Sequence, residues 1–228
     1  MTQGALLIIK PGTRINFINP QADISIFGGL SAKGTPDSII TIQKDISDTR
    51  NPKGGILSIH DMGSAEFEYC SFQNALLGVV IDWTSRNEVR IDRCRFEGCL
   101  TGILNDSKTI ELSNLSFVNN SREAYLRSSH FNSYTDTIRW CLFDGNQLDI
   151  SFGGHENNNM LAFDRCNFKN SEKIFEFYRF NEANGIHNSS VLVTHSYGIA
   201  AVDSMFGTNS LVVADAEESP VPNAGCGF

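Results

Sequence analysis

The clearest pattern along the chain is a set of apolar positions that recurs about every 24 residues. One column contains five phenylalanines, which are Phe72, Phe96, Phe117, Phe143 and Phe168. The column two residues earlier contains Cys70, Cys94, Leu115, Cys141 and Cys166. A third column, three residues before that, contains Phe67, Ile91, Leu112, Ile138 and Phe163. Columns that stay in step over five repeats indicate a chain that winds like a coil and stacks equivalent residues on one another.

Each repeat is expected to contain a first strand through the Cys-x-Phe pair, a polar turn and a second strand. The turns contain Asn or Gly, which suit left-handed backbone conformations. By alternation, the second strands should direct these pairs inward: Val79/Ile81, Ile103/Asn105, Ala124/Leu126, Ile150/Phe152 and Phe175/Phe177. Asn105 interrupts this apolar set and is expected to begin a buried polar ladder or a loop.

The regions on either side of the repeats are less regular. Five short β-rich segments with turn signals between them precede the repeats, at residues 6–9, 13–17, 24–27, 39–42 and 56–59. Residues 189–213 are expected to form a last, irregular coil. No stretch shows the sustained periodicity of an amphipathic helix. The sequence therefore predicts one domain, a parallel β-helix over residues 1–213, followed by a C-terminal tail or linker over residues 214–228. This tail is expected to be either a linker or an extended arm that lies along the surface.

Three local motifs resemble those of a known fold family. Residues 9–17 are similar to a "PGT-x-I-x-F" opening coil, residues 24–35 to an "I-x-V-x-G-x-L-x-A-x-G-T" coil, and residues 68–72 to an "L-E-Y-C-x-F" coil. The chain thus resembles the right-handed parallel β-helix proteins of the pectin-lyase-like superfamily. The resemblance implies an all-β, right-handed, single-stranded parallel β-helix with about 24 residues per coil. It implies no single activity, because the group includes lyases, glycosidases, tailspikes and adhesins.

Composition and charge narrow the function classes. The chain has 228 residues, a formal net charge of −8 and only 19% charged residues. Binding of nucleic acid is not expected, because phosphate recognition requires a basic face. No apolar run approaches the roughly 20 residues of a membrane span, so no membrane insertion is expected. The amino terminus shows no signal peptide and enters a strand at once, so the chain is expected to be part of a longer extracellular or cell-surface polypeptide.

The six cysteines are expected to be reduced. Four of them occupy the inward column, where stacked neighbours lie about 4.8 Å apart, whereas disulfide Cβ atoms need about 3.5–4.5 Å and a specific torsion angle. Buried thiols that pack as small hydrophobic groups are therefore predicted for the column. Cys226, which lies in the tail, is expected to be the most reactive thiol.

One candidate for chemistry is the outward face of the first strands. Stacking places Glu66, Arg90, Glu111, Thr137 and Ala162 in one column there. Next to it are Glu68, Asp92, Ser113, Arg139 and Asp164, and then Ser71, Arg95, Ser116, Leu142 and Asn167. Abstraction of a proton beside a uronate carboxylate needs a base and a cation, and the catalytic candidates for that reaction are Asp92, Arg95, Arg139 and Asp164. The alternative is a surface ladder of alternating charge that contributes little per pair.

A second candidate is a rim formed by the loops that follow the second strands. Equivalent loops of a solenoid emerge on one side, and aromatic faces beside polar groups are suited to stack on sugar rings. The predicted ligand-binding residues are Trp83, Arg86, His130, Tyr134, His155, Glu156, Tyr178 and His187. The alternative is that these loops only cover the solenoid, with their aromatic side chains packed inward.

The leading functional expectation is a non-catalytic β-helix module that contacts a polysaccharide, a cell-surface glycan or a partner molecule. The alternatives are a polysaccharide lyase or glycoside hydrolase acting on acidic polysaccharide, and a structural spacer or adhesin stalk. No cofactor and no metal are predicted: calcium would need several converging oxygen ligands, and the sequence shows no clear cage. Nucleophile, phosphate-binding and dinucleotide-binding motifs do not appear.

Overall fold

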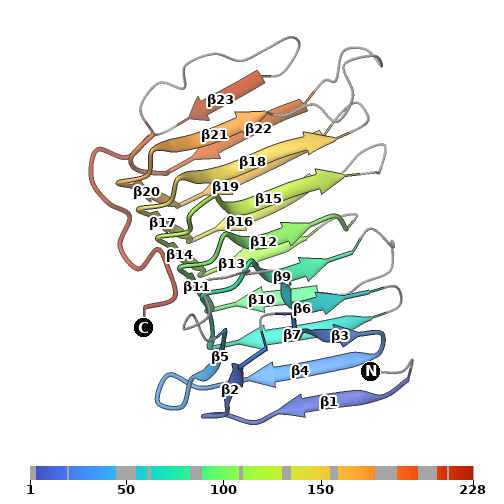
Figure 1. Ribbon diagram of the computed structural model, residues 1–228. Helices are drawn as coiled ribbons and strands as arrows, with labels where there is room; N and C mark the ends of the chain where they lie inside the picture. Colours follow the sequence, from blue (N-terminus) through green and yellow to red (C-terminus); the bar gives the residue numbers. More distant parts are fainter. Residues whose placement is uncertain are drawn as a thin grey trace.

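The protein is a parallel β-solenoid built from three sheets (Figure 1). The computed structural model describes residues 4–19, 21–44, 55–60, 63–82, 89–107, 110–129, 135–154, 159–177, 189–199, 210–214 and 216–227. Within these ranges the secondary structure is all β, without helix. Through most of the chain, successive strands lie in the first, second and third sheet in turn and then return to the first. The predicted fold class is therefore confirmed.

The three sheets, here named A, B and C, contain nine, seven and seven strands among the described residues. In spatial order, sheet A contains β1 (Leu6–Ile9), β4 (Gly29–Lys33), β7 (Ser64–Glu68), β10 (Val89–Asp92), β13 (Glu111–Ser113), β16 (Thr135–Arg139), β19 (Asn159–Asp164), β22 (Ser189–Thr194) and β23 (Ser210–Ala214). Sheet B contains β2 (Arg14–Phe17), β5 (Ile40–Lys44), β8 (Cys70–Gln73), β11 (Arg95–Glu97), β14 (Ser116–Val118), β17 (Leu142–Asp144) and β20 (Asn167–Lys169). Sheet C contains β3 (Ile24–Ile26), β6 (Gly55–Ile59), β9 (Leu77–Ile81), β12 (Thr101–Asn105), β15 (Glu123–Ser129), β18 (Leu148–Gly154) and β21 (Lys173–Phe177).

A continuous stack of phenylalanine rings runs through the core behind sheet B. Its members pair in register across successive strands, in the order Phe72, Phe96, Phe117, Phe143 and Phe168. Neighbouring ring centroids lie 4.9–5.2 Å apart and the rings are within 15° of parallel. All five side chains are at most 3% exposed. The predicted phenylalanine column is thus present, and the strand spacing of about 4.8 Å sets the distance between its rings.

The first strand of each repeat is broken into two, which differs from the single strand that the sequence suggests. The break lies at the residue just before the cysteine column, where φ is positive: 50° at Tyr69, 49° at Arg93 and 56° at Trp140. This residue turns the chain from sheet A into sheet B, so the earliest apolar column lies in sheet A and the phenylalanine column in sheet B. Side chains that do not favour the left-handed region occupy this corner, and for that reason the sequence did not reveal it.

The second corner, between sheets B and C, agrees with the sequence prediction. Its left-handed residues are Asn or Gly in every repeat: Asn74, Gly98, Asn119, Gly145 and Asn170. These are the residue types that adopt this conformation at least cost.

Inside the second corner, buried asparagines form a hydrogen-bonded ladder. Asn120 Oδ1 accepts from the backbone N–H of Cys99 at 3.0 Å, and Asn120 Nδ2 donates to Asn146 Oδ1 at 2.9 Å. Asn146 Nδ2 in turn donates to Asp149 Oδ1 at 2.9 Å, and the Ser171 hydroxyl donates to the same oxygen at 2.7 Å. This ladder satisfies backbone and side-chain polar groups that the corner buries, whereas Asp149 Oδ2 has no hydrogen-bond partner among the described residues.

In the third repeat, the predicted inward pair Ala124/Leu126 is wrong at its second position. The register places Tyr125 opposite Ile103 and Arg127 opposite Asn105, so Tyr125 and Arg127 point inward and Leu126 turns outward. Arg127 is fully buried and its Nε lies 2.7 Å from Oδ2 of the equally buried Asp136. The Tyr125 hydroxyl donates to Asp136 at 3.0 Å, and Asn105 Nδ2 donates to that hydroxyl at 2.9 Å. The expectation that Asn105 begins a buried polar group is confirmed.

One strand of sheet A is additional to the β-rich segments expected before the repeats. β4 begins at Gly29 and alternates buried Leu30 and Ala32 with more exposed Ser31 and Lys33. The Gly28-Gly29 pair suggests a turn, but Gly29 pairs with Leu6 as the first strand residue. The strand has only five residues and begins with a glycine, so its alternation is too short to be recognised from the sequence.

All six cysteines are thiols, and all are buried. Burial raises the pKa of the Cys94 and Cys141 thiols, and that of Cys99 to about 11. The expectation of inert thiols in the column is supported by this geometry. Cys226, predicted to be the most reactive thiol, is only 9% exposed because the tail segment that contains it packs onto sheet B. Its relative reactivity stays a prediction.

The phenylalanine stack predicts a large effect of truncation at its centre. Phe117→Ala should destabilise the protein by about 3–5 kcal/mol, because the rings of Phe96 and Phe143 cannot move into the vacated layer. Urea unfolding measures this difference, with Phe27→Ala as control because Phe27 is 43% exposed. Equal unfolding free energies for the two variants would contradict the predicted role of the stack.

The buried Asp149 predicts a dependence of stability on pH. Burial raises the pKa of Asp149 from 3.8 to about 7. Between these pH values the folded protein keeps a proton that the unfolded chain loses, so stability falls as pH rises through the window. Asp149→Asn should remove this loss, which corresponds to at most roughly 4 kcal/mol. Urea unfolding at pH 5 and pH 8 tests this prediction, with the exposed Asp37→Asn variant as control. The prediction fails if the difference in unfolding free energy between Asp149→Asn and the parent is the same at both pH values.

Candidate functional site

The corner between sheets A and B presents a row of large side chains on the outside of the solenoid. We call this row the corner ladder; its members are Tyr69, Arg93, Asn114, Trp140, Arg165 and His195. Each has a positive φ between 46° and 56° and is partly exposed. Backbone hydrogen bonds hold the row in register, as from Trp140 N–H to Asp164 O at 3.0 Å. The corner conformation therefore fixes the position of one side chain per coil.

At the end nearer the amino terminus, an arginine lies over an aromatic ring. The guanidinium of Arg93 is 5.6 Å from the centroid of Tyr69. Arg93 Nη1 also donates to Glu68 at 3.0 Å and to Asp92 at 2.9 Å. Cation–π contact and two carboxylates together hold this guanidinium in one orientation.

The same arrangement recurs at the other end of the ladder. The guanidinium of Arg165 lies 5.0 Å from the ring centroid of Trp140, and its Nη1 donates to Asp164 Oδ2 at 3.0 Å. His195 Nδ1 lies 3.0 Å from Asp164 Oδ1, which also accepts from the Thr194 hydroxyl at 3.1 Å. Asp164 therefore orients both an arginine and a histidine beside an indole ring.

The C-terminal tail covers part of this region. We call residues 216–227 the strap: they run back along the outside of sheet B, beside β20, β17 and β14 (Figure 1). Asn167 fixes Val221 from both sides, because its Nδ2 donates to Val221 O at 2.9 Å and its Oδ1 accepts from Val221 N–H at 2.7 Å. Further along, Gly225 N–H donates to Trp140 O at 2.7 Å and Cys226 N–H donates to Ser116 Oγ at 3.0 Å. The predicted tail is thus an ordered part of the fold.

A cleft of about 470 Å³ lies between the corner ladder and the strap. Trp140, Arg165 and His195 form one side of it. The strap forms the other side, with Glu217 and the segment 219–223. The cleft thus combines an indole ring, a guanidinium, an imidazole and a carboxylate, which are groups that can stack on and hydrogen-bond to a polar ligand.

The four predicted catalytic candidates lie in the columns that the sequence assigned to them. Asp92, whose side chain is 7% exposed, accepts from Ser113 at 3.0 Å and from Asn114 at 2.8 Å. Arg139 pairs with Glu111 at 3.1 Å on the exposed face of sheet A.

The other two candidates have partners of their own, although Asp164 is the neighbour of Arg139 in the register of sheet A. Arg95 lies around the corner on sheet B, where its Nε is 2.9 Å from Glu97. Asp164 is engaged by Arg165 and His195. The four side chains therefore serve separate local pairs. Two of them contact the corner ladder: Asp92 binds Arg93 and Asn114, and Asp164 binds Arg165 and His195.

The eight residues predicted to form the loop rim lie outside the described residues: Trp83, Arg86, His130, Tyr134, His155, Glu156, Tyr178 and His187. Their proposed role stays a prediction.

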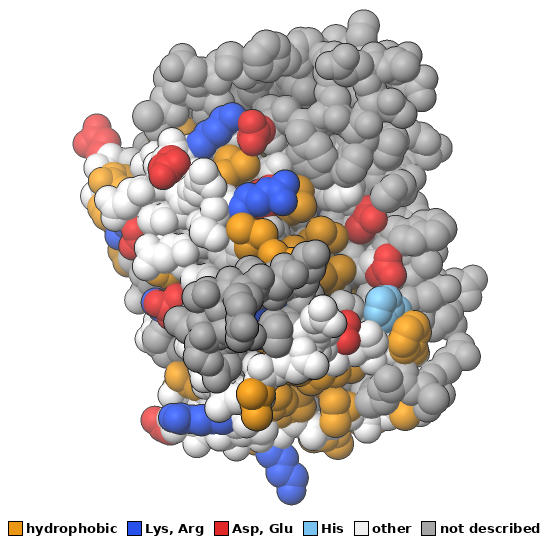
Figure 2. Space-filling view, in the orientation of Figure 1, with side chains coloured by type: hydrophobic (Ala, Val, Ile, Leu, Met, Phe, Trp, Pro, Cys, Tyr) orange, Lys and Arg blue, Asp and Glu red, His pale blue; other side chains and the backbone are white. Residues whose placement is uncertain are grey.

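The described residues hold no group of three or more His, Cys, Asp or Glu side chains placed to bind a metal ion. In the same part of the chain, no helix has the length and hydrophobicity required to cross a bilayer. The face drawn in Figure 2 shows Lys and Arg side chains scattered among Asp and Glu rather than gathered in one basic patch.

Comparison with known proteins adds no assignment: no protein family, curated protein or solved structure matches this chain.

The corner ladder was missed by the sequence analysis, although a signal for it exists. Its members are the residues immediately before the cysteine column, and they recur with the same period as that column. Their chemical types differ from coil to coil, so a search for repeated residue types does not find them. A search for positions that recur with this period and carry large polar or aromatic residues would find the corner ladder.

The double hydrogen bond to Asn167 predicts how the strap can be released. Asn167→Ala should increase the alkylation rate of Cys226 in the native protein about tenfold, since it removes two buried hydrogen bonds from the strap. The four column cysteines should stay slow, as mass spectrometry of the labelled thiols would show. Asn16→Ala, at an exposed position at the other end of sheet B, is the matched control. An unchanged Cys226 rate in Asn167→Ala would mean that other contacts hold the strap.

Proposed function

We propose that the chain is a non-catalytic β-solenoid module of the pectin-lyase-like type that binds glycans in an extracellular or cell-surface protein. The observation that carries the proposal is the repeated pairing of an aromatic ring with an arginine on the corner ladder, Tyr69 with Arg93 and Trp140 with Arg165. Aromatic faces stack on the apolar faces of sugar rings, and arginine, asparagine and carboxylate groups hydrogen-bond to sugar hydroxyl groups.

The length of the ladder supports a polymeric ligand. Successive members stand about 4.8 Å apart along the axis, so the row from Tyr69 to His195 spans five steps, or roughly 24 Å. A ligand of that length would make modest contacts at several coils. The predicted loop rim, from Trp83 to His187, stays part of the proposal as a second contact region for a polysaccharide or surface glycan.

The separation of the candidate catalytic groups favours binding over turnover. A base and a neutralising cation must reach the same sugar residue. Asp92 and Arg139 belong to one column but stand two coils apart, which is about 10 Å. Each is also held by a nearer partner. Asp164 is the register neighbour of Arg139, but its carboxylate oxygens are already engaged by Arg165 and His195. This arrangement supports a binding surface in which the charged groups orient one another.

One observation favours the alternative of a lyase or glycoside hydrolase acting on acidic polysaccharide. Next to the cleft, Asp164 Oδ1 lies 3.0 Å from Nδ1 of His195, and Arg165 binds the other carboxylate oxygen; both of these partners line the cleft. A carboxylate that orients an imidazole is a common arrangement for a general base, and the guanidinium would neutralise a uronate carboxylate. No cofactor enters either proposal.

Substitution of Trp140 tests the glycan proposal. A carbohydrate array identifies a ligand, and calorimetric titration with it should show about three- to tenfold weaker binding to Trp140→Ala, because one stacking contact is lost. Phe27→Ala, which removes a partly exposed aromatic side chain that is not part of the ladder, should bind as the parent does.

Two outcomes would replace this proposal. Release of unsaturated or reducing-end products from an acidic polysaccharide, abolished by Asp164→Asn, would establish the enzyme. Absence of any glycan ligand on the array would leave the structural spacer as the remaining function.

A further inference from the structure

The outer face of sheet B presents one straight row of side chains along the solenoid axis. We call it the outer row; strand pairing places its members in register, in the order Arg14, Thr41, Ser71, Arg95, Ser116, Leu142 and Asn167. Successive members stand about 4.8 Å apart. Because one sheet carries the whole row, its two halves form a continuous surface.

The strap occupies the half of the row nearer the carboxyl terminus. Asn167 hydrogen-bonds to both backbone polar groups of Val221, and Ser116 Oγ accepts from the backbone N–H of Cys226. Ser116 and Asn167 are each 3% exposed beneath it. All three contacts use the strap's main chain, so this half of the row holds a polypeptide mainly through its backbone.

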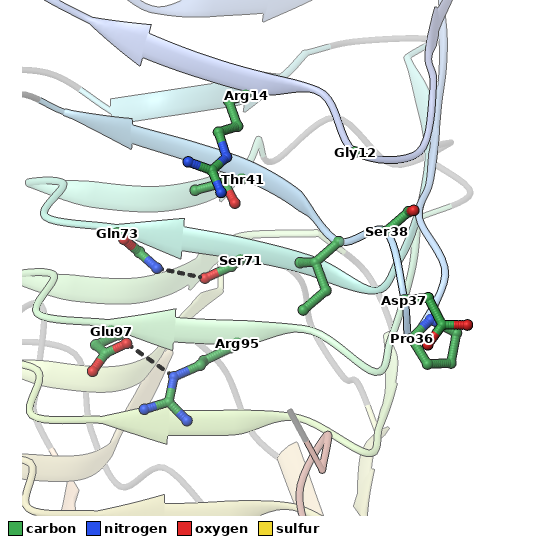
Figure 3. Close-up of a pocket in the computed structure, with 11 residues that line it drawn as sticks. Gly12, Arg14, Pro36, Asp37, Ser38, Thr41, Ser71, Gln73, Arg95 and Glu97 are labelled. Carbon is green, nitrogen blue, oxygen red and sulfur yellow. Dashed lines mark hydrogen bonds and ion pairs between the residues drawn. The ribbon is translucent and has the colours of Figure 1, made fainter.

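The other half of the row is an open cleft of about 650 Å³ (Figure 3). It is lined by the remaining members of the row, Arg95, Ser71, Thr41 and Arg14, together with Gln73, Glu97 and the loop at residues 36–39. The cleft begins next to Ser116, the residue that holds Cys226. The open half therefore continues the surface on which the chain's own tail already lies.

The open half offers the same kinds of groups as the covered half. Hydroxyls at Ser71 and Thr41 correspond to Ser116, and a side-chain amide at Gln73, whose Nε2 donates to Ser71 Oγ at 2.9 Å, resembles Asn167. These groups can accept from and donate to a peptide backbone. Since the polar chemistry and the axial spacing are both retained, a second polypeptide segment fits this surface as the strap fits the other.

Charge distinguishes the two ends of the open half. Arg95 is neutralised by Glu97 at 2.9 Å, whereas Arg14 is exposed and forms no ion pair with another described residue. Asp37 also lines the cleft, but Figure 3 shows it on the side opposite Arg14. The strap runs from Val221 towards Cys226, in the direction of Arg14, so a segment of the same polarity would bring its C-terminal end to that arginine.

We propose that the open half of the outer row binds a short linear peptide of a partner protein, in the polarity of the strap, with a C-terminal carboxylate or acidic side chain at Arg14. The distance from Arg95 to Arg14 is three steps, or roughly 14 Å, which an extended segment of about four residues spans. The site is separate from the corner ladder and does not depend on the proposed glycan function.

Fluorescence polarisation with labelled peptide pools tests the proposal on the full chain. The probes are two pools of randomised hexapeptides, one ending in Glu with a C-terminal carboxylate and one ending in Gln with a C-terminal amide. The Glu pool should bind about tenfold more tightly, because an arginine–carboxylate hydrogen bond is charge-assisted. Arg14→Gln should abolish this preference. Arg90→Gln, which removes an exposed arginine from sheet A, should leave it unchanged.

Several results would overturn the proposal. Equal binding of the two pools, no binding of either, or the same loss in Arg90→Gln would each exclude a carboxylate-selective peptide site at Arg14. If an acidic hexasaccharide binds instead and Arg14→Gln removes that binding, the cleft is a glycan site rather than a peptide site. Trp140→Ala separates the two proposals, because it should weaken glycan binding and leave the affinity for the peptide pool unchanged.

Discussion

The structure depends on parallel pairing of coils in register, which stacks each inward residue on its equivalent in the next coil. The phenylalanine stack shows the consequence most clearly, because its ring separation of 4.9–5.2 Å is set by the strand spacing. Neighbouring positions must then accommodate the stack. A Cβ at Gly102, for example, would lie 3.0 Å from the Phe117 ring, so sheet C has no room for a side chain there. The residue type at an inward position therefore depends on the residues stacked above and below it in the same column.

Stacking in register also requires every coil to turn at the same point, and the two left-handed corners provide this. At the B–C corner the requirement is met by Asn and Gly, which adopt positive φ at least cost. At the A–B corner it is met by Tyr69, Arg93, Trp140 and their equivalents, for which positive φ costs of order 1 kcal/mol or more. Interactions of their side chains, such as Arg165 over Trp140, offset part of that cost. An energetically unfavourable position that keeps large polar and aromatic residues is a reasonable place to seek function.

The sequence predicts those features that repeat by residue type. The phenylalanine and cysteine columns and the Asn/Gly corner were all found from periodicity, and the structure contains them. The inward Arg127 was missed because alternation of apolar residues favoured Leu126, whereas the register with β12 and the buried partner Asp136 decide the orientation. The sequence left open whether the tail is a linker or an extended arm on the surface. It could not predict the contacts of the strap, because pairs such as Cys226 with Ser116 join residues 110 positions apart and follow no period. The corner ladder was missed because only its position repeats.

The strap, which follows no period, sets the boundaries of both candidate sites on the regular solenoid. A solenoid alone would present the same outer row from end to end. By covering Ser116, Leu142 and Asn167, the strap divides this row into an occupied and an open half, and its other edge forms the cleft beside Trp140. Both candidate sites therefore take their boundaries from one segment, which Asn167 holds by two hydrogen bonds. Displacement of the strap would extend the open half of the row and at the same time remove one wall of the corner cleft, so ligands at the two sites would be coupled through its position.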